Sequence, residues 1–196
     1  MTVRANKPEF NIREKLKSLD YGNVPYEKMP AGSVIQVVQT EFRNSFSNST
    51  PVTLAKVTGL STTISPKLAS SKLLIRCDVT VGQKYWQVVG RLYRNDVRVT
   101  DAEGIQDGVK PQSWFCIVDY GEQDLGASSA GYNMHQISAS YMDTADTTST
   151  LTYDLYFGNL WSATSPVFIN RQHTWSNGAT YTAQPISTMT IMEIKQ

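Results

Sequence analysis

The chain has 196 residues, enough to bury one full-sized core, and its 18 Lys and Arg nearly balance its 17 Asp and Glu, for a net charge of +1. That balance argues against a nucleic-acid partner, which would need a strongly basic surface, and against attraction to an anionic membrane. The sequence has no apolar run of about 18 residues and no hydrophobic signal core, so we expect no membrane partner and synthesis in a reducing cytoplasm.

Residues 1–30 differ in pattern from the rest of the chain and predict an N-terminal arm with a short helix. Asn11 is a candidate N-cap, and Glu14 completes a capping box. A helix of about nine residues is marginal in water by itself. It needs a surface, which could belong to its own domain, a sister subunit or a different protein. We favour docking onto another component of an assembly, through Phe10, Ile12, Leu16, Leu19, Tyr21 and Tyr26.

The arm is only mildly basic, with six Lys and Arg against four Asp and Glu. A nucleic-acid-binding arm would show a denser basic run, so we do not favour that function. Residues 31–196 are predicted to form one separate domain.

Strand patterns begin at residue 31 and continue to the end of the domain. Only 18% of the residues are charged, which suits short strands with neutral polar outer faces. Residues 33–40 alternate between apolar and polar, 44–51 read as a loop, and 52–57 read as a second strand. The pattern is clearest over residues 60–81, LSTTISPKLASSKLLIRCDVTV, where two alternating strands flank a turn at Pro66.

The remaining strands follow at spacings typical of sandwiches and barrels. Asn95 and Asp96 predict a two-residue hairpin turn. Long loops are expected at 101–113 and 121–131, and a turn at 143–148. The predicted strands are 85–94, 97–100, 114–120, 132–142, 151–157, 166–170 and 185–195. We therefore predict an all-β, antiparallel jelly-roll β-sandwich, preceded by the arm, with its first and last strands as neighbours.

The sequence carries no catalytic, cofactor or metal motif. His135 and His173 lack ligand spacing to each other or to a cysteine. Cys77 and Cys116 lie in apolar runs and are expected to be buried, reduced thiols, although a disulfide between them stays open. We predict no enzyme and no cofactor. The alternative of glycoside hydrolysis would use paired carboxylates, Asp143 with Asp146 or Glu122 with Asp124.

Two biases in composition mark candidate surfaces for contact with a partner. Residues 111–170 contain no Lys or Arg, and their acids could mark a face for a basic partner, a cation-binding loop or, as we favour, a solvated rim; these acids are Asp119, Glu122, Asp124, Asp143, Asp146 and Asp154. Aromatic residues also cluster, at Tyr156, Phe157, Trp161, Phe168, Trp175 and Tyr181. Most are expected in the core. Trp161, Phe168 and Trp175 are candidates for a subunit interface, and a sugar-stacking platform is a further alternative.

Several segments in order resemble small virion structural proteins of tailed bacteriophages. They are AGSVIQVVQT at 31, GLSTTISPKLASSKLLI at 59, VFINR at 167, STMTIMEI at 187 and the arm KPEFNIREKLKSLDYGNVPYEKMPAGSV. The resemblance implies a jelly-roll or tumour-necrosis-factor-like domain that forms a homo-oligomer, with a trimer favoured, on a phage particle. Residues 101–131 depart from it.

The resemblance and the arm together predict a non-enzymatic virion protein. We expect a capsid decoration, cement or head-fibre component that is made in the host cytoplasm and docks on capsid or other virion proteins. The alternative is a tail-fibre or receptor-binding module whose loops 101–113 and 121–131 contact a glycan or protein of the host surface.

Overall fold

Strands make up most of the described chain. The computed structural model describes residues 25–50, 52–83, 86–119, 130–160, 166–174 and 182–196. Within these ranges the helices are three 3-10 helices of three residues each, η1 (Tyr26–Lys28), η2 (Thr100–Ala102) and η3 (Ala130–Tyr132). The described residues contain no helix with the length and apolar character needed to cross a membrane.

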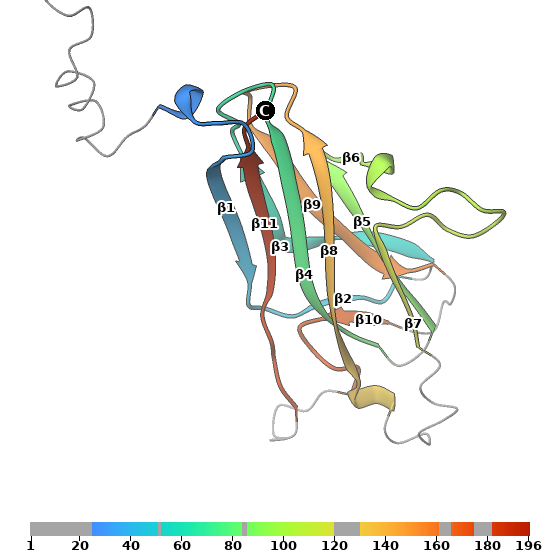
Figure 1. Cartoon of the computed structure of the whole chain (residues 1–196). Coiled ribbons are helices and arrows are strands. Elements are labelled where there is room, and N and C mark those ends of the chain that lie inside the picture. The colour runs from blue at the N-terminus through green and yellow to red at the C-terminus, as the bar shows by residue number, and fades with distance from the viewer. Residues whose placement is uncertain (1–24, 51, 84–85, 120–129, 161–165, 175–181) are drawn as a thin grey trace, which may run out of the picture.

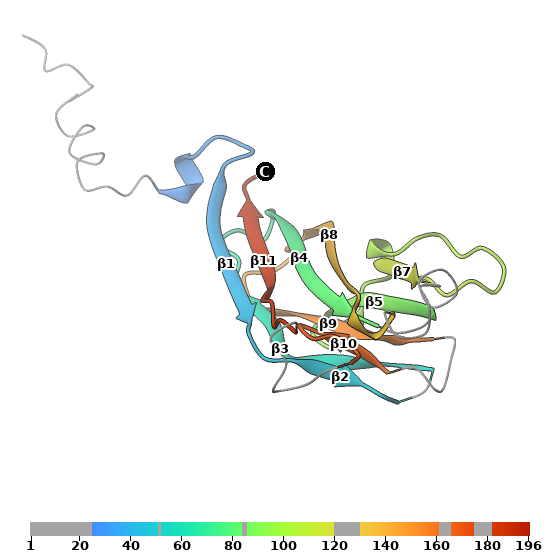
Figure 2. The same ribbon diagram turned by 90° about the horizontal axis from the view of Figure 1, so that it is seen from below.

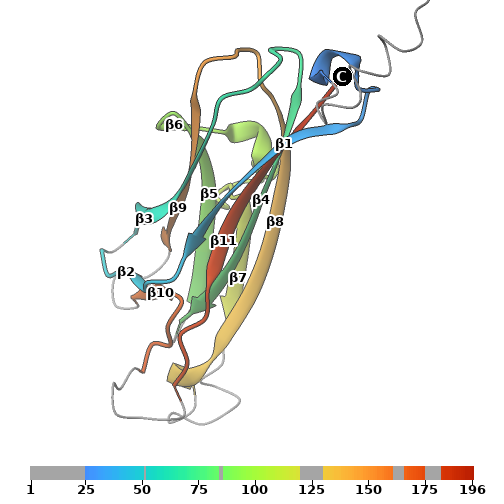
Figure 3. The same ribbon diagram turned by 90° about the vertical axis from the view of Figure 1, so that its left-hand side faces the viewer.

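Two antiparallel sheets pack face to face, as Figures 1 and 3 show. Sheet A has six strands and sheet B has five. In sheet A, β11 lies between β1 and β4, β8 pairs with the other edge of β4, and the short strands β10 and β2 extend the far end. In sheet B, β9 lies between β3 and β5, and both β6 and β7 pair with β5. The prediction of an antiparallel β-sandwich is confirmed.

The predicted strands occur in the predicted order along the chain, with the following bounds. Sheet A comprises β1 (Val34–Phe42), β2 (Phe46–Asn48), β4 (Lys72–Gly82), β8 (Met134–Thr144), β10 (Val167–Ile169) and β11 (Ser187–Ile194). Sheet B comprises β3 (Thr53–Ile64), β5 (Trp86–Arg94), β6 (Val97–Arg98), β7 (Phe115–Asp119) and β9 (Leu151–Asn159).

The stretch 60–81 supplies the centre of the core. Leu60 and Ile64 of β3 and the alternate residues of β4 are buried between the sheets. The turn between these strands is held by Glu193 of β11, a carboxylate with no exposed surface. Its oxygens accept hydrogen bonds from the backbone N–H groups of Lys67 and Leu68 at 2.9 and 3.0 Å, and from the Gln36 amide at 2.6 Å. A buried carboxylate is stable here because several donors replace its water.

Two local predictions were wrong. The strands predicted at 52–57 and 60–65 form one strand, β3, because Gly59 adopts a φ of +96° and the register with β9 shifts between Lys56 and Ser61. Such a bulge lets the strand continue with its pattern displaced. The predicted loop 44–51 contains β2, which pairs with β10. Asn48 fixes it, since its amide donates to the carbonyls of Thr53 and Phe157.

The predicted hairpin at Asn95 and Asp96 is confirmed. Both residues have positive φ, 51° and 61°, as the tight turn between β5 and β6 requires. Asn95 also accepts a hydrogen bond from the Thr152 N–H and donates its own N–H to the Thr152 carbonyl. The strand expected at 97–100 is shorter, because the chain turns into η2 at Thr100.

The first and last strands are neighbours, as predicted. β1 pairs with β11 over their whole length, with Val38 opposite Ile191. The C-terminus therefore lies beside η1, at the end of the sandwich where the chain enters it (Figure 1).

Candidate functional site

The junction between the predicted arm and the sandwich is tied to the C-terminal end of β11. The Lys195 ammonium donates to the carbonyls of Glu27 and Met29, at 2.5 Å each. The backbone of Lys195 accepts from Gly32 at 2.7 Å and donates to Ser33 at 2.9 Å. Residues 27–33 are thus fixed to the domain, although no residue of η1 is buried. Residues 27–33 therefore have a defined place beside the C-terminal end of β11.

The predicted docking residues fall into two groups. Tyr26 lies in η1 and is half-buried. A hydrogen bond with the Glu27 side chain, together with the charge of that carboxylate, raises the pKa of its phenol. Phe10, Ile12, Leu16, Leu19 and Tyr21 lie outside the described residues, as do Trp161 and Trp175, so their contacts stay predictions.

Phe168, the third predicted interface residue, is described and is only 7% exposed. The Arg171 guanidinium carbon lies 4.4 Å from the centre of its ring, and the ring of His173 meets it edge-on at 5.7 Å. Its ring is therefore covered by its own chain, which leaves little surface for a partner.

Two residues of the predicted aromatic cluster, Tyr156 and Phe157, point to opposite faces of sheet B, whereas Phe168 belongs to β10 of sheet A and Tyr181 lies outside the described residues. Phe157 points into the core, where its ring meets Phe46 edge-on at 6.5 Å. Tyr156, the preceding residue, points outward and stacks on Tyr93 with ring centres 3.8 Å apart. Successive side chains of a strand point to opposite faces, which explains the division.

The loop after η2 is held by hydrogen bonds between its two ends and carries two exposed aliphatic side chains. Gly104 donates to the Ser113 carbonyl at 3.3 Å, and the Gln112 amide returns a bond to the Gly104 carbonyl at 2.9 Å. Figures 1 and 2 show the loop projecting from the sandwich. Ile105 and Val109 are 96% and 100% exposed there. Two exposed apolar side chains do not by themselves mark an interaction surface, but they make this loop a candidate for contact with another molecule.

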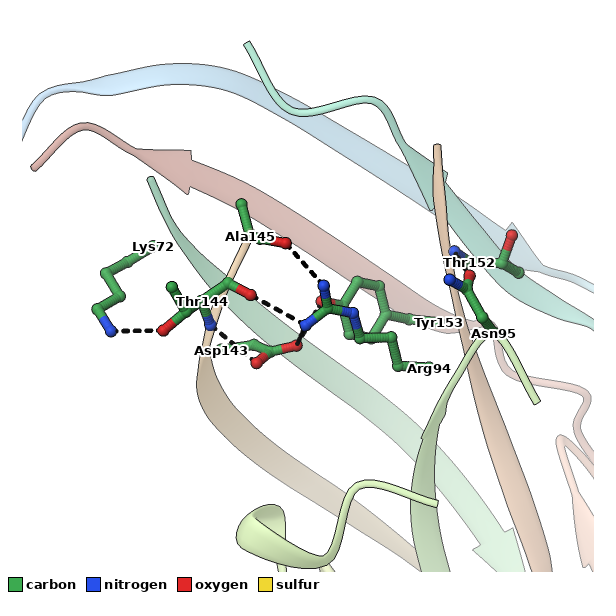
Figure 4. Close-up of polar contacts among 8 residues, drawn as sticks. All are labelled: Lys72, Arg94, Asn95, Asp143, Thr144, Ala145, Thr152 and Tyr153. Atoms are coloured by element: carbon green, nitrogen blue, oxygen red, sulfur yellow. Dashed lines mark hydrogen bonds and ion pairs between the residues drawn. The ribbon is translucent and has the colours of Figure 1, made fainter. Parts of the chain in front are cut away.

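A polar cluster joins the two sheets at the end of the sandwich beside this loop (Figure 4). Arg94 of β5 donates to Asp143 of β8 at 3.0 Å and to the carbonyls of Thr144 and Ala145 at 2.9 and 2.7 Å. The Tyr153 hydroxyl donates to the same carboxylate at 2.6 Å. Burial and this hydrogen bond raise the pKa of Tyr153, so the phenol stays protonated. The cluster fixes β5 against β8.

An open cleft of about 250 Å³ lies next to this cluster. Its walls come from β5, β6, η2 and β8: Arg94, Val97, Arg98, Val99, Thr100, Asp101, Tyr141 and Asp143. Arg98 is bound to Glu103, so both cleft arginines already hold carboxylates. Burial, and then the charges of Asp143 and Asp101, raise the pKa of Tyr141. The cleft can accept a small polar molecule, but it offers no arginine free to bind an anion.

The carboxylates proposed for glycoside hydrolysis are differently placed. Asp143 is bound by Arg94, by Tyr153 and by the N–H of Thr144 at 2.8 Å. Asp146 is exposed in a turn with a φ of +57°, and Glu122 and Asp124 lie outside the described residues. Asp154, another acid of the stretch 111–170, is buried and paired with Lys56 at 2.9 Å. Two of the acids predicted to be solvated are thus held in ion pairs.

The thiols and histidines form no site that the structure describes. Both cysteines are free; Cys77 is buried, and burial raises its pKa. The prediction that Cys116 is buried was wrong: Phe115, the residue before it in β7, faces the core, so Cys116 points outward and is exposed. Among the described residues no group of His, Cys, Asp and Glu is arranged to hold a metal ion.

Comparisons with known proteins leave the family open. No family model matches the chain, and no curated protein matches it. A solved structure of dimeric latent PorU from Porphyromonas gingivalis is similar over 85% of this chain, with 8% identity and a TM-score of 0.34. The match spans 14% of that protein, and a TM-score this low supports no conclusion about function.

Proposed function

We propose that the chain is a non-enzymatic structural protein of a tailed-bacteriophage virion. In this proposal it is a capsid decoration, cement or head-fibre component, and residues 1–30 dock it on capsid or other virion proteins. Residues 31–196 form the exposed domain of a homo-oligomer, with a trimer favoured. The proposal rests on the sequence resemblance and on the arrangement at the N-terminal end of the domain.

A jelly roll is the finer form of sandwich that we propose for the domain. If β1, β3, β4, β5, β7, β8, β9 and β11 are numbered 1 to 8, sheet A has the order 1-8-3-6 and sheet B the order 2-7-4-5. Consecutive strands then mostly change sheet, as two interlocked Greek keys require. This order supports the jelly roll without specifying what the domain does.

The observation that carries the function is the anchored junction at residues 27–33. The bonds from Lys195 fix the point from which the arm leaves, so the arm extends from one end of the domain. A segment that orders only on its receptor binds weakly by itself. Several arms leaving the same end of an oligomer would raise the effective concentration and make attachment stable.

The arm prediction is tested by binding full-length chain to particles that lack it. The triple variant Phe10→Asp, Ile12→Asp and Leu16→Asp should remain folded and lose attachment. The matched control is Val109→Asp, because Val109 is 100% exposed on the distant loop, and it should attach normally. Equal attachment of the triple variant would contradict docking through the arm.

The location on the particle is tested separately by gold-labelled antibody imaging of intact virions. Label over the head would support decoration or a head fibre. Label confined to the tail would contradict that function and favour the alternative.

The loop at residues 103–113 supports one alternative, a tail-fibre or receptor-binding module. Ile105 and Val109 are presented to solvent on an internally bonded loop, as a contact with a host glycan or protein would require. This function predicts that the isolated protein binds host cells and that Ile105→Asp with Val109→Asp abolishes the binding. The arm variant should then bind cells normally, which separates the two functions.

A further inference from the structure

The outward face of sheet A carries a row of apolar side chains that crosses four strands. In the paired register, Val37 of β1 lies opposite Met192 of β11, Met192 opposite Leu74 of β4, and Leu74 opposite Met142 of β8. The neighbouring residues Leu73 and Ile75 are completely buried in the core, so this row must lie on the opposite face. The row therefore faces away from sheet B.

The next row towards the chain ends extends the apolar surface. Val34 pairs with Ile194, directly beside the junction of the arm. Val34, Val37 and Met142 are 49%, 55% and 46% exposed, and Leu74, Met192 and Ile194 are partly exposed. We call these six residues the apolar band. Scattered exposed apolar residues are ordinary, whereas a contiguous group in adjacent rows marks an interaction surface.

We propose that the apolar band is the contact between copies of this chain. The inference rests on the proposed homo-oligomer and names its interface. In the assembly, the outward faces of sheet A turn towards the symmetry axis, so that the bands of neighbouring copies lie against one another there. The arms then leave from the same end of the assembly, because Val34 and Ile194 adjoin the junction that Lys195 holds.

The charges around the band favour an identical partner. The four strands of the face carry Lys72 and Arg76 against Glu41 and Asp78, and Arg43, which follows β1, is bound to Glu41, so the face has no strong excess of either sign. Arg76 and Asp78 are also neutralised within the strand, by hydrogen bonds of 2.8 and 3.1 Å. A face built to bind a charged partner would carry an excess of the opposite sign.

The polar residues beside the band are also self-complementary. The row after it consists of Gln39, Thr190, Arg76 and Ser140. Thr190 is buried and accepts from the Gln39 amide at 2.8 Å within the chain, whereas Gln39 and Ser140 are exposed and keep groups that can donate to and accept from a second copy. Four strands at about 4.8 Å spacing, over the length of β11, give a face of roughly 500 Å². Together with the turns that flank it, this approaches the roughly 800 Å² per partner of a stable complex.

The test is the mass of the full-length chain in solution, by sedimentation or light scattering at micromolar concentration. The wild type should have a small multiple of the 21.9 kDa chain mass. Leu74→Lys with Met142→Lys should give a monomer with an unchanged far-UV circular dichroism spectrum. The control Val97→Lys, at a residue 69% exposed in the hairpin of sheet B, should keep the wild-type mass. A monomeric wild type, or an oligomeric double variant, would overturn the proposal.

If the double variant does not fold, a second measurement tests whether copies of the chain meet at the apolar band. In a Cys116→Ser background, Ser140→Cys places a thiol beside the band, and oxidation should yield cross-linked dimers. Thr63→Cys, exposed on sheet B, should yield few. Equal cross-linking at both positions would contradict the proposed contact. Neither measurement uses phage particles, so this inference can fail while arm docking stands, and docking can fail while the oligomer stands.

Discussion

The two outward faces of the sandwich are built in opposite ways. The face of sheet A carries the apolar band and only a few charged side chains of both signs, whereas the face of sheet B is covered by its own charged and aromatic side chains. There, Lys56 is paired with Asp154, Tyr93 is stacked on Tyr156, and Arg98 is bound to Glu103. A face whose polar groups bind one another is complete in the single chain. A face with exposed methionine, leucine and valine gains free energy when a partner covers it.

Lys56→Met should cause the largest loss of stability, because it strands the Asp154 carboxylate on the face of sheet B. Asp154 is 1% exposed, and the Lys56 ammonium at 2.9 Å is its ion-pair partner among the described residues. Breaking a buried pair leaves an uncompensated charge, so we expect a loss of about 3 kcal/mol at pH 7, measured by urea unfolding.

Adding Asp154→Asn is the control for this variant. It removes the stranded charge and should recover most of the lost stability. If Lys56→Met alone were as stable as the wild type, the stability of sheet B would not depend on this ion pair.

Glu103→Ala should have a smaller effect on the same face. Its carboxylate is fully buried between Arg98 and Arg91, and it raises the pKa of Arg98 by hydrogen bonding. Both arginines keep some exposure and can regain water, so we expect a loss of about 2 kcal/mol in urea unfolding. Arg43→Ala, in an exposed ion pair with Glu41, is the matched control and should change stability by less than about 0.5 kcal/mol.

Met142→Thr on the face of sheet A should barely change the stability of the single chain. Met142 is 46% exposed, and a β-branched residue suits a strand, so the change should stay within about 0.5 kcal/mol at concentrations where the chain is monomeric. Urea unfolding at several protein concentrations measures this. A larger loss that persists on dilution would show that Met142 belongs to the fold and would weaken the contrast between the faces.

Asp78→Asn should have the smallest effect on the free energy of unfolding, and this effect should be lost at acid pH. Burial acts to raise the pKa of Asp78, but hydrogen bonds from Arg76 and Ser138 outweigh it and lower the pKa. A lowered pKa stabilises the fold above the unfolded value of about 3.9, and the contribution is lost as pH falls through the folded pKa. We expect a cost of a few tenths of a kcal/mol at pH 7 for this partly exposed pair. Urea midpoints that differ as much at pH 2.5 as at pH 7 would contradict this cause.

Local alternation was enough to predict most strands. The two strands within residues 60–81 were predicted correctly because alternate side chains there are buried. The turn at Asn95 and Asp96 was predicted correctly because those residue types tolerate positive φ. The prediction failed where the cause is distant in sequence. β2 is held in place by hydrogen bonds from the Asn48 amide to the carbonyls of Thr53 and Phe157. The sequence of residues 44–51 contains no pattern that predicts these two partners.

The sequence by itself determined the all-β class, the position of the strongest strands and the meeting of the first and last strands. Only the tertiary structure decided which residues share a surface. The apolar band draws Val37, Leu74, Met142 and Met192 from four separate strands, and their alignment depends on the register of three strand pairs. A register shift of one residue would turn each of these side chains to the other face, so the band is a property of the pairing and not of any one segment.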